Sequence, residues 1–409
     1  MKKILILLVI AFIAITLNAQ TQTIVYIDNT YTGVVSTGSI TQPLTALPKF
    51  TNGGKYYIKA GTTIDNKITI SNICNNVLLT RYGEGKNPII KNLNSRYKTK
   101  NFTIAGTGNK IKGIDFIVDS YAPTADNSGT ANIYQNGGSL TVEDCLLIGG
   151  HPAFNWSNID SLYIYNCHIK NFTYDAMWGQ WANYIKVNKC KFDSAYIDYT
   201  NANDTFSTDI IHVKDCKELI VDSSYLDHNY SGKYCIISHT DKQPLPYYKV
   251  KLSNSTFIGK YGYSQANLRP TIMSTEIINC KILNSQTGIQ GAGDTLIVKN
   301  CTFDKFSNKA IEQGWVKYQK VTDCTFTNSK VAIENKASIN TNCAFSEADI
   351  AAGKGAKIII TPPVVISPVI KVDSLIIYRN VMNKIVIPGL LNKYQTKASI
   401  LKQIKAVIK

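Results

Sequence analysis

Several patterns that define common protein classes are missing from this chain of 409 residues. No two of its ten cysteines have the CxxC spacing of a zinc site, and no second apolar run follows the one that ends at Leu17. No recognisable nucleic-acid-binding module is present. The sequence therefore argues against a structural zinc centre, a membrane-spanning protein and a nucleic-acid partner.

A short motif instead recurs along the chain. It consists of an apolar residue, one or two polar residues that include Asn or Asp, then Cys or Ser, one further residue, and Phe, Leu or Ile. The Cys or Ser stands at positions 145, 167, 190, 224, 255, 280, 301, 324 and 343, and half of the intervals are 21 to 23 residues. Self-similarity at a period of about 22 residues indicates a solenoid.

A coil of this length can close only by stacking on the next coil, because it has short strands, Asn and Gly turns and no helical stretch. A second strand follows several of the motifs, at 175–178, 209–212, 287–290, 309–312 and 331–334. Two repeating columns in one register predict an all-β fold. The predicted fold is a single-stranded right-handed parallel β-helix with a short C-terminal extension.

Equivalent residues of stacked coils form ladders along the axis. We expect the Phe, Leu and Ile of the motif to point inward, and Asn166, Asn279, Asn300 and Asn342 to stack at one turn. Ten cysteines in an exported chain would suggest disulfides, but seven occupy one repeat position that Ser fills twice. This pattern favours buried free thiols in a ladder over a disulfide framework.

The two ends of the chain differ from the solenoid. Residues 1–19 have the charged, apolar and small-residue regions of a secretory signal, so we expect a secreted protein, in the periplasm, on the cell surface or outside the cell. We assign residues 20–361 to the β-helix and residues 362–409 to a basic extension. Apolar residues between 401 and 408 have helical spacing, which predicts a helix that caps the solenoid. Binding of this helix to a membrane or a cell-wall polymer is the alternative.

The formal charge of +16 is unevenly placed. Lys2 and Lys3 belong to the predicted signal, and residues 374–409 hold seven basic residues and no acidic one, which leaves +7 on residues 4–373. The solenoid is therefore only mildly basic, and charge alone does not name a polyanion as its partner.

Three consecutive coils are longer than the others, with 34, 31 and 25 residues. Their extra residues fall at 196–207, 240–248 and 260–270. Because insertions at one turn of successive coils collect on one face, we expect these three loops to line one groove.

Five runs follow one another in this section: TDIIH at 208–212, IVDSSYLDH at 220–228, GKYCII at 232–237, VKLSNSTF at 250–257 and LRP at 268–270. They resemble the core of pectate-lyase-like β-helix proteins, where an F-x-D-H-x-K-x-x-L-I-G strand precedes V-T-x-x-x-N-x-F and an R-x-P-x-x-R loop. The resemblance implies a secreted lyase that cleaves a uronate-containing glycan by β-elimination. Lys233 would match the family's carboxylate-binding lysine and Arg269 its catalytic arginine. Asn188 replaces the family's calcium aspartate, and Met273 a second arginine.

β-Elimination requires a base that removes the proton next to a carboxylate and a positive group that neutralises this carboxylate. Arg269, Lys233 and His212 are the predicted catalytic residues. Arginine is a poor base because its pKa is about 12.5 or higher, so His212, on an outward position beside Trp178, is a rival for that role. The predicted substrate-binding residues are Trp178, Trp181, Tyr199 and Lys233.

Asp175, Asp198, Asp204 and Asp209 offer hard oxygen ligands that would suit Ca²⁺, although Asp is also common at turns. A glycoside hydrolase would need two carboxyl groups that flank the scissile bond, and the outward strand positions offer no convincing pair. A non-catalytic β-helix that binds a glycan or a surface is favoured by the departures from the family pattern. The expected partner is an acidic polysaccharide, and the expected state is a monomer.

Overall fold

The computed structural model describes residues 23–345 with gaps, and three short strands between residues 370 and 386. The gaps are 66–69, 93–99, 119–130, 174, 196–208, 229–232, 241–247, 262–263, 271–273, 292, 313–315, 317, 334–338 and 342–343. The predicted signal at 1–19 and the predicted helix at 401–408 lie outside the described residues. So do Asp198, Tyr199, Asp204, Asn342 and Cys343.

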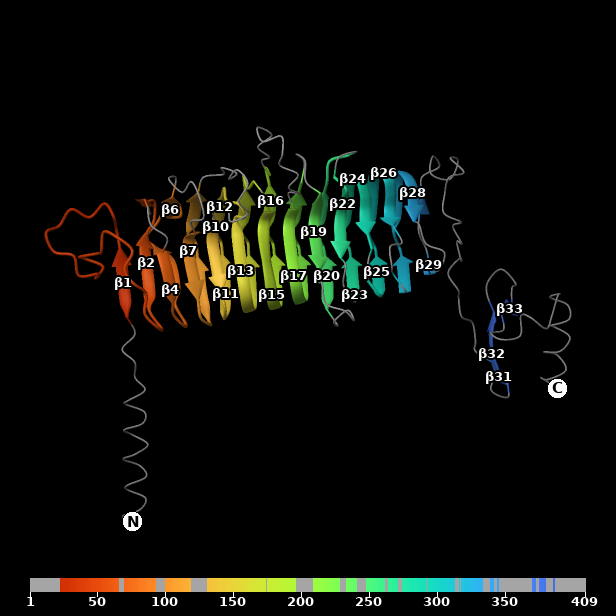
Figure 1. The fold of residues 1–409 in the computed structure, drawn as a ribbon, viewed down its shortest axis with the longest axis horizontal. Coiled ribbons are helices and arrows are strands. Elements are labelled where there is room, and N and C mark those ends of the chain that lie inside the picture. Colours follow the sequence, from red (N-terminus) through yellow and green to blue (C-terminus); the bar gives the residue numbers. More distant parts are fainter. Residues whose placement is uncertain are drawn as a thin grey trace, which may run out of the picture.

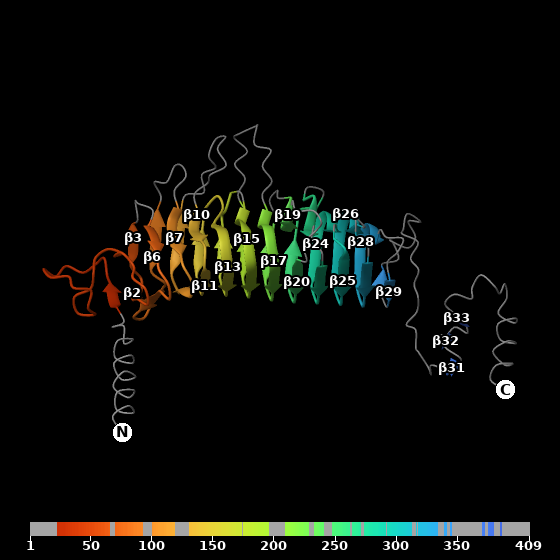
Figure 2. The same ribbon diagram turned by 60° about the horizontal axis from the view of Figure 1, so that its bottom comes forward.

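Thirty strands, β1 to β30, form one continuous parallel hydrogen-bonded system. They lie side by side along the long axis of the molecule, from β1 at one end to β29 near the other (Figures 1 and 2). Each coil contributes to three columns, which we call sheets 1, 2 and 3. The predicted parallel β-helix is thereby confirmed, and the described residues contain no helix.

The strands that form sheet 1 include six long ones that bend around a corner into a neighbouring sheet. Sheet 1 comprises β4 (Ile70–Ile73), β7 (Lys100–Ala105), β10 (Ala131–Asn136), β13 (Phe154–Tyr165), β15 (Asp175–Asn188), β17 (Asp209–Asp222), β19 (Tyr234–His239), β22 (Ala266–Pro270), β24 (Lys281–Gln290), β26 (Thr302–Glu312) and β28 (Thr325–Ile333). The second halves of β13, β15 and β17 continue into sheet 2, and the first halves of β24, β26 and β28 belong to sheet 3.

The other two sheets consist mostly of shorter strands. Sheet 2 adds β1 (Ile24–Ile27), β2 (Lys55–Lys59), β5 (Leu78–Tyr82), β8 (Asn109–Lys112), β11 (Ser139–Glu143), β20 (Lys249–Ser253), β23 (Ser274–Ile278), β25 (Thr295–Lys299), β27 (Tyr318–Thr322) and β29 (Ile339–Thr341). Sheet 3 adds β3 (Thr63–Asp65), β6 (Ile89–Asn92), β9 (Asp115–Val118), β12 (Leu146–Ile148), β14 (His168–Lys170), β16 (Lys191–Asp193), β18 (Tyr225–Asp227), β21 (Thr256–Ile258) and β30 (Ala344–Phe345). In the C-terminal extension, β31 (Ile370–Val372), β32 (Leu375–Arg379) and β33 (Ile385–Val386) pair antiparallel.

The recurring motif forms the turn between sheets 2 and 3. Its last residue belongs to one axial row of fully buried side chains: Leu147, Ile169, Phe192, Leu226, Phe257, Ile282, Phe303 and Phe326. The residue before each described Cys or Ser has a positive φ of 50 to 56°. This left-handed conformation explains the preference for Asn and Asp, which adopt it more readily than other residues with a side chain.

Side-chain amides also join neighbouring coils at this turn. The Asn300 Nδ2 atom donates to Asn279 Oδ1 at 2.8 Å, and Asn279 Nδ2 donates to Asn254 Oδ1 at 3.1 Å. At the same turn of earlier coils, Asn166 Nδ2 donates to Asp144 Oδ1 at 2.7 Å. The predicted ladder of Asn side chains is therefore confirmed over these coils.

All nine cysteines within the described residues are free and buried. Their thiols contact backbone carbonyls instead of one another's sulfur in disulfides; for example, Cys301 Sγ lies 3.2 Å from the Lys299 carbonyl oxygen. The interpretation of the motif cysteines as buried free thiols is thus confirmed, because a small thiol fills the inward position at the turn.

The three long insertions do not leave the solenoid at the same turn. In chain order, residues 196–208 come between β16 of sheet 3 and β17 of sheet 1, and residues 260–265 between β21 of sheet 3 and β22 of sheet 1, whereas 240–248 come between β19 of sheet 1 and β20 of sheet 2. The last five residues of the third predicted loop, 266–270, form strand β22 instead. The expectation of a single insertion turn was wrong. All three insertions are adjacent in sequence to strands of sheet 1.

Candidate functional site

The outer surface of sheet 1 carries a row of side chains from successive coils. Trp178 of β15 pairs with His212 of β17, His212 with Ile237 of β19, and Ile237 with Arg269 of β22. The neighbouring residues that point inward, such as Met177 and Ile211, are fully buried. Because stacked strands are about 4.8 Å apart, the backbones of His212 and Arg269 are about 10 Å apart. The sequence was therefore right to place Trp178, His212 and Arg269 on one wall.

Two carboxylates lie next to His212. The His212 Nδ1 atom lies 3.4 Å from Asp175 Oδ2 and 3.5 Å from Asp209 Oδ2. The other carboxylate oxygens accept backbone N–H groups of the next coil: Asp175 Oδ1 from Asp209 at 2.9 Å, and Asp209 Oδ1 from Tyr234 at 3.0 Å. These bonds fix both carboxylates at the start of their strands, so that their second oxygens face the imidazole.

The two carboxylates are much more deeply buried than the imidazole. The side chains of Asp175 and Asp209 are 0% and 1% exposed, whereas that of His212 is 17% exposed. Burial raises the pKa of Asp175 well above its usual value, and burial together with the charge of Asp175 does the same to the pKa of Asp209. Burial also lowers the pKa of His212, against the opposing effect of Asp209. A neutral imidazole is consequently the form of His212 that this environment favours.

Arg269 is held in place by a tyrosine that sequence reasoning did not single out. One guanidinium nitrogen of Arg269 donates to the Tyr234 hydroxyl at 2.8 Å, and the guanidinium carbon lies 5.4 Å from the centre of the Tyr234 ring. The Tyr234 hydroxyl in turn donates to Gln265 Oε1 at 2.7 Å. Because Tyr234 belongs to β19, these contacts draw the Arg269 side chain from β22 toward β17.

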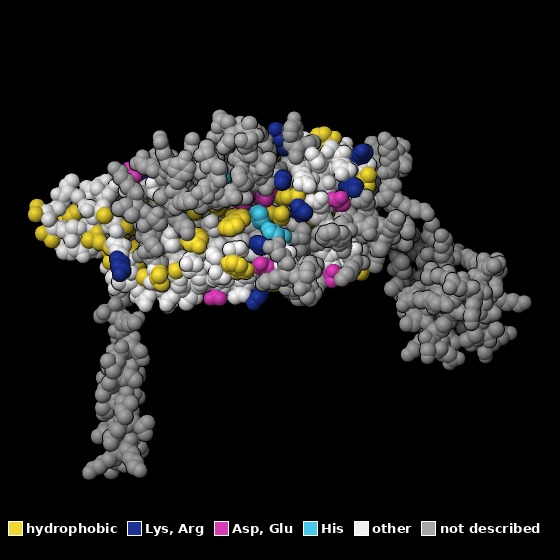
Figure 3. All heavy atoms as spheres, viewed as in Figure 1, with side chains coloured by type: hydrophobic (Ala, Val, Ile, Leu, Met, Phe, Trp, Pro, Cys, Tyr) yellow, Lys and Arg dark blue, Asp and Glu magenta, His cyan; other side chains and the backbone are white. Residues whose placement is uncertain are grey.

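The position of Tyr234 in the repeat was the available signal. It pairs with Asp209, which pairs with Asp175, so all three begin equivalent strands of sheet 1. His239 was also not among the predicted site residues, but its ring centre lies 5.1 Å from that of His212. Figure 3 shows histidine side chains gathered in the middle of the face seen in Figure 1.

The remaining predicted residues lie at the margins of this row. Lys233 is exposed and immediately precedes β19, where its carbonyl oxygen accepts the Ala266 N–H at 3.1 Å. Trp181 is 44% exposed and occupies the corner of β15 between sheets 1 and 2, with a positive φ of 59°. Both are exposed, but neither belongs to the row of His212.

In sequence, the chain matches no protein-family model and no curated protein. In structure, it is similar to the GH136 lacto-N-biosidase from Eubacterium ramulus, with 7% identity over 78% of this chain and 68% of the other, at a TM-score of 0.41. It is similar to the catalytic domain of a GH87 alpha-1,3-glucanase in complex with nigerose, with 13% identity over 75% and 64% of the two chains, at 0.36. It is also similar to tailspike protein 3 of bacteriophage CBA120, with 9% identity over 82% of this chain and 64% of the other, at a TM-score of 0.24. These TM-scores are too low to indicate a function, so the function is inferred below from the residues of the site.

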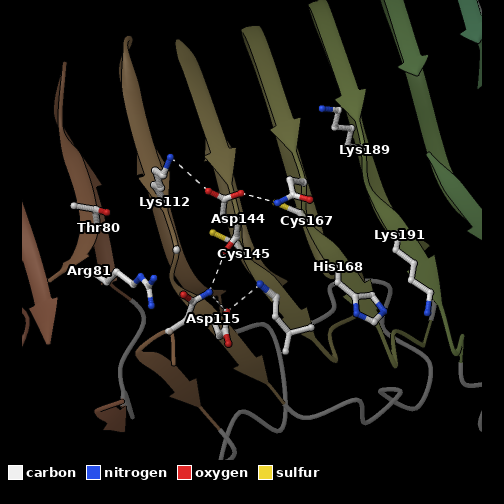
Figure 4. A pocket seen from close by; sticks show the side chains of 14 residues that line it. Thr80, Arg81, Lys112, Asp115, Asp144, Cys145, Cys167, His168, Lys189 and Lys191 are labelled. Atoms are coloured by element: carbon white, nitrogen blue, oxygen red, sulfur yellow. Dashed lines mark hydrogen bonds and ion pairs between the residues drawn. The ribbon is translucent and has the colours of Figure 1, made fainter. Parts of the chain in front are cut away.

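A second polar region lies on the opposite side of the coil, at the turn between sheets 2 and 3. It is a depression of about 740 Å³ lined by Thr80, Arg81, Asn87, Lys112, Gly113, Asp115, Asp144, Cys145, Leu146, Asn166, Cys167, His168, Lys189 and Lys191 (Figure 4). Two of its four Lys and Arg side chains pair with carboxylates: Lys112 lies 2.6 Å from Glu143, and Lys191 lies 2.6 Å from Asp193. Asp115 and Asp144 also line it, so carboxylates offset part of its positive charge and make this depression a weaker candidate than sheet 1 for an acidic ligand.

The described residues that could hold a metal ion are Asp175, Asp209 and His212, whose ligand atoms all lie within 4.8 Å of one another. Ca²⁺ takes six to eight oxygen ligands, and this set offers two carboxylates and an imidazole. The predicted partners Asp198 and Asp204 lie outside the described residues. The donor set therefore fits Ca²⁺ less well than it fits a metal ion that accepts imidazole.

No helix among the described residues is long and apolar enough to cross a membrane.

Proposed function

We propose that this protein is a secreted polysaccharide lyase that cleaves a uronate-containing glycan by β-elimination on the outer surface of sheet 1. The observation that carries the proposal is the row of Trp178, His212 and Arg269 on strands β15, β17 and β22. It combines the proton acceptor and the fixed cation that this reaction needs with an aromatic surface on which a sugar ring can stack.

In the proposed reaction, His212 accepts the proton from the carbon next to the uronate carboxylate. The electron pair of that C–H bond becomes a C=C double bond as the C–O bond to the leaving sugar breaks, and the imidazolium then returns the proton to the leaving oxygen. Asp175 and Asp209 do not reach solvent, so they act as positioning residues that hold the imidazole. This arrangement resembles in logic the buried carboxylate that orients a catalytic histidine in hydrolases.

Arg269 supplies the positive charge for the uronate carboxylate. A guanidinium group presents two parallel N–H donors to a carboxylate and keeps its charge at any pH of interest, which suits this role better than that of a base. Its hydrogen bond to the Tyr234 hydroxyl limits its freedom before the substrate binds. Lys233, which is exposed and immediately precedes β19, would bind a carboxylate of a neighbouring sugar unit.

The burial of both aspartates argues against glycoside hydrolysis at this place. A hydrolase needs two carboxyl groups in contact with the glycosidic bond, and the exposed fractions of Asp175 and Asp209 are 0% and 1%. The reading as a non-catalytic glycan-binding protein needs only the aromatic and cationic groups. The two remaining readings therefore differ in whether His212 performs chemistry.

The test is to incubate the purified protein with polygalacturonate, alginate and glycosaminoglycans, in EDTA and with Ca²⁺, and to follow the ultraviolet absorbance of the unsaturated product. We expect one of these polymers to yield product and both His212→Ala and Arg269→Ala to abolish it. His168→Ala, a change at the turn of sheets 2 and 3, is the matched control and should retain activity. Binding of a polymer without any product would overturn the lyase proposal and support the non-catalytic reading.

A further inference from the structure

Asp175, Asp209 and His212 leave one buried oxygen without a donor. Asp175 is fully buried, and its Oδ2 atom has no hydrogen-bond partner among the described residues, although it faces the imidazole at 3.4 Å. The 3.4 and 3.5 Å contacts of Nδ1 with the two carboxylates are long, and neither is accompanied by hydrogen-bond geometry. Two neighbouring carboxylates with an unsatisfied buried oxygen form an environment that a cation would stabilise.

Two of the three spacings between the donor atoms match a tetrahedral metal site, and all three are within 4.8 Å. A metal ion bound at about 2.0 to 2.2 Å by tetrahedrally arranged ligands places these ligands about 3.3 to 3.6 Å apart. The Nδ1 atom of His212 lies at such a distance from both carboxylate oxygens. The backbone N–H bonds to the outer oxygens of Asp175 and Asp209 would orient these ligands from behind, as partners of metal ligands commonly do.

We infer that Asp175, Asp209 and His212 form a binding site for one divalent transition-metal ion such as Zn²⁺, with a fourth position left for water or a ligand. An imidazole nitrogen is a ligand for Zn²⁺ and its neighbours in the first transition series, whereas Ca²⁺ and Mg²⁺ prefer oxygen. The site is therefore selective for Zn²⁺ over the calcium ion that the four aspartates suggested in the sequence.

Metal binding would also regulate the chemistry of the same histidine. A neutral imidazole that binds a metal ion through Nδ1 carries its proton on Nε2, so it has no lone pair left to accept a substrate proton. The metal-bound protein would then be inactive in β-elimination. This consequence rests on the proposed function, whereas the metal site itself does not.

The binding test uses the full-length protein after treatment with EDTA and its removal. Calorimetric titration with ZnCl₂ should show one ion bound per chain, and titration with CaCl₂ much weaker binding at that site. Asp175→Asn and His212→Ala should each weaken Zn²⁺ binding at least about tenfold. His168→Ala is the matched control, because His168 also contacts an aspartate, Asp193, at 3.0 Å but has only this one carboxylate beside it. Equal Zn²⁺ affinity in wild type and His212→Ala would overturn the site.

A second measurement needs no variant. Co²⁺ added to the metal-free wild type should give the visible absorption of a four-coordinate ion, and Zn²⁺ should displace it; absence of this spectrum would overturn the proposed geometry. The lyase assay is run separately in EDTA and with Zn²⁺. Activity in EDTA that is lost with Zn²⁺ supports both proposals. Zn²⁺ binding without activity in EDTA would reject the proposed function and leave the metal site standing, and activity that persists with Zn²⁺ bound would reject the regulation.

Discussion

Two histidines contact aspartates on different sides of the β-helix, and the two contacts differ in burial and in the pKa of the aspartates. At the turn of sheets 2 and 3, His168 Nε2 lies 3.0 Å from Asp193 Oδ1, and the two side chains are 34% and 17% exposed. Partial burial raises the pKa of Asp193, but the hydrogen bonds from Lys191 and His168 outweigh it and hold this pKa below its usual value. At sheet 1, His212 faces two buried carboxylates whose pKa values are raised.

The difference teaches that residue types alone do not define a site. Asp193 also binds Lys191 at 2.6 Å, so its charge is neutralised within the protein and little is left for a ligand. Asp175 and Asp209 instead accept backbone N–H groups and lie beside one imidazole. Two adjacent buried carboxyl groups with raised pKa values are unfavourable for folding and are typical of a functional site.

The sharpest test of this comparison is to remove each histidine in turn. Loss of a general base typically costs about 10² to 10⁴ in rate, so His212→Ala should lower kcat by that factor while His168→Ala leaves it unchanged. The measurement is the initial rate of unsaturated product formation in EDTA on the polymer that the wild type cleaves. Equal losses in both variants would mean that the effect is structural and that sheet 1 is not the site.

A third histidine tests how burial alone acts on stability. His151 is 7% exposed, its Nδ1 atom lies 3.1 Å from the Thr173 hydroxyl, and burial lowers its pKa to about 4. Between pH 6.5 and 4, the unfolded chain therefore binds a proton that the folded chain does not, and the free energy of unfolding falls as the pH falls. We expect a loss of about 3 kcal/mol from this residue, from about 1.4 kcal/mol for each pKa unit.

The measurement is the free energy of unfolding in urea at several pH values. His151→Gln should be less stable than wild type at pH 7.5 yet lose less stability on acidification. Parallel curves for wild type and His151→Gln would contradict the expected effect of burial.

The two aspartates should differ in the sign of their effect on stability. Asp175→Asn keeps an oxygen for the Asp209 N–H and removes one of two neighbouring buried carboxylates, so we expect a gain of about 1 kcal/mol in the metal-free protein. Asp193→Asn breaks a half-exposed pair with Lys191 and His168, and such pairs contribute at most about 1 kcal/mol, so a small loss is expected. Chemical unfolding in EDTA measures both, and a loss for Asp175→Asn would show that its carboxylate is stabilising without a metal ion.

The fold followed from the sequence because its repeat is enforced by packing. The row from Leu147 to Phe326 must be apolar in every coil, and the turn before Cys or Ser must accept a left-handed residue, so both leave a visible period. The residues of the candidate site do not repeat from coil to coil, so the sequence shows no periodic pattern for them. Tyr234 and His239 were missed because their roles depend on neighbours from other coils, and the insertion turns were misplaced because loop length alone does not say which corner of a coil is extended.

Trp181 allows a comparison between binding and stability at one residue, and it has the smallest expected effect. The equivalent corners of the neighbouring coils hold Asn158 and Asp215, which share its positive φ of 53 to 59°. A left-handed conformation costs about 1 to 2 kcal/mol in residues other than Gly, Asn and Asp, and an exposed Trp recovers little of this by packing. Trp181→Asn should therefore stabilise the fold by about 1 kcal/mol and weaken polysaccharide binding. The reverse change, Asn158→Trp, is the matched control and should destabilise the fold. If Trp181→Asn is less stable than wild type, the tryptophan is retained for packing, and its proposed role beside the His212 row would lose its physical basis.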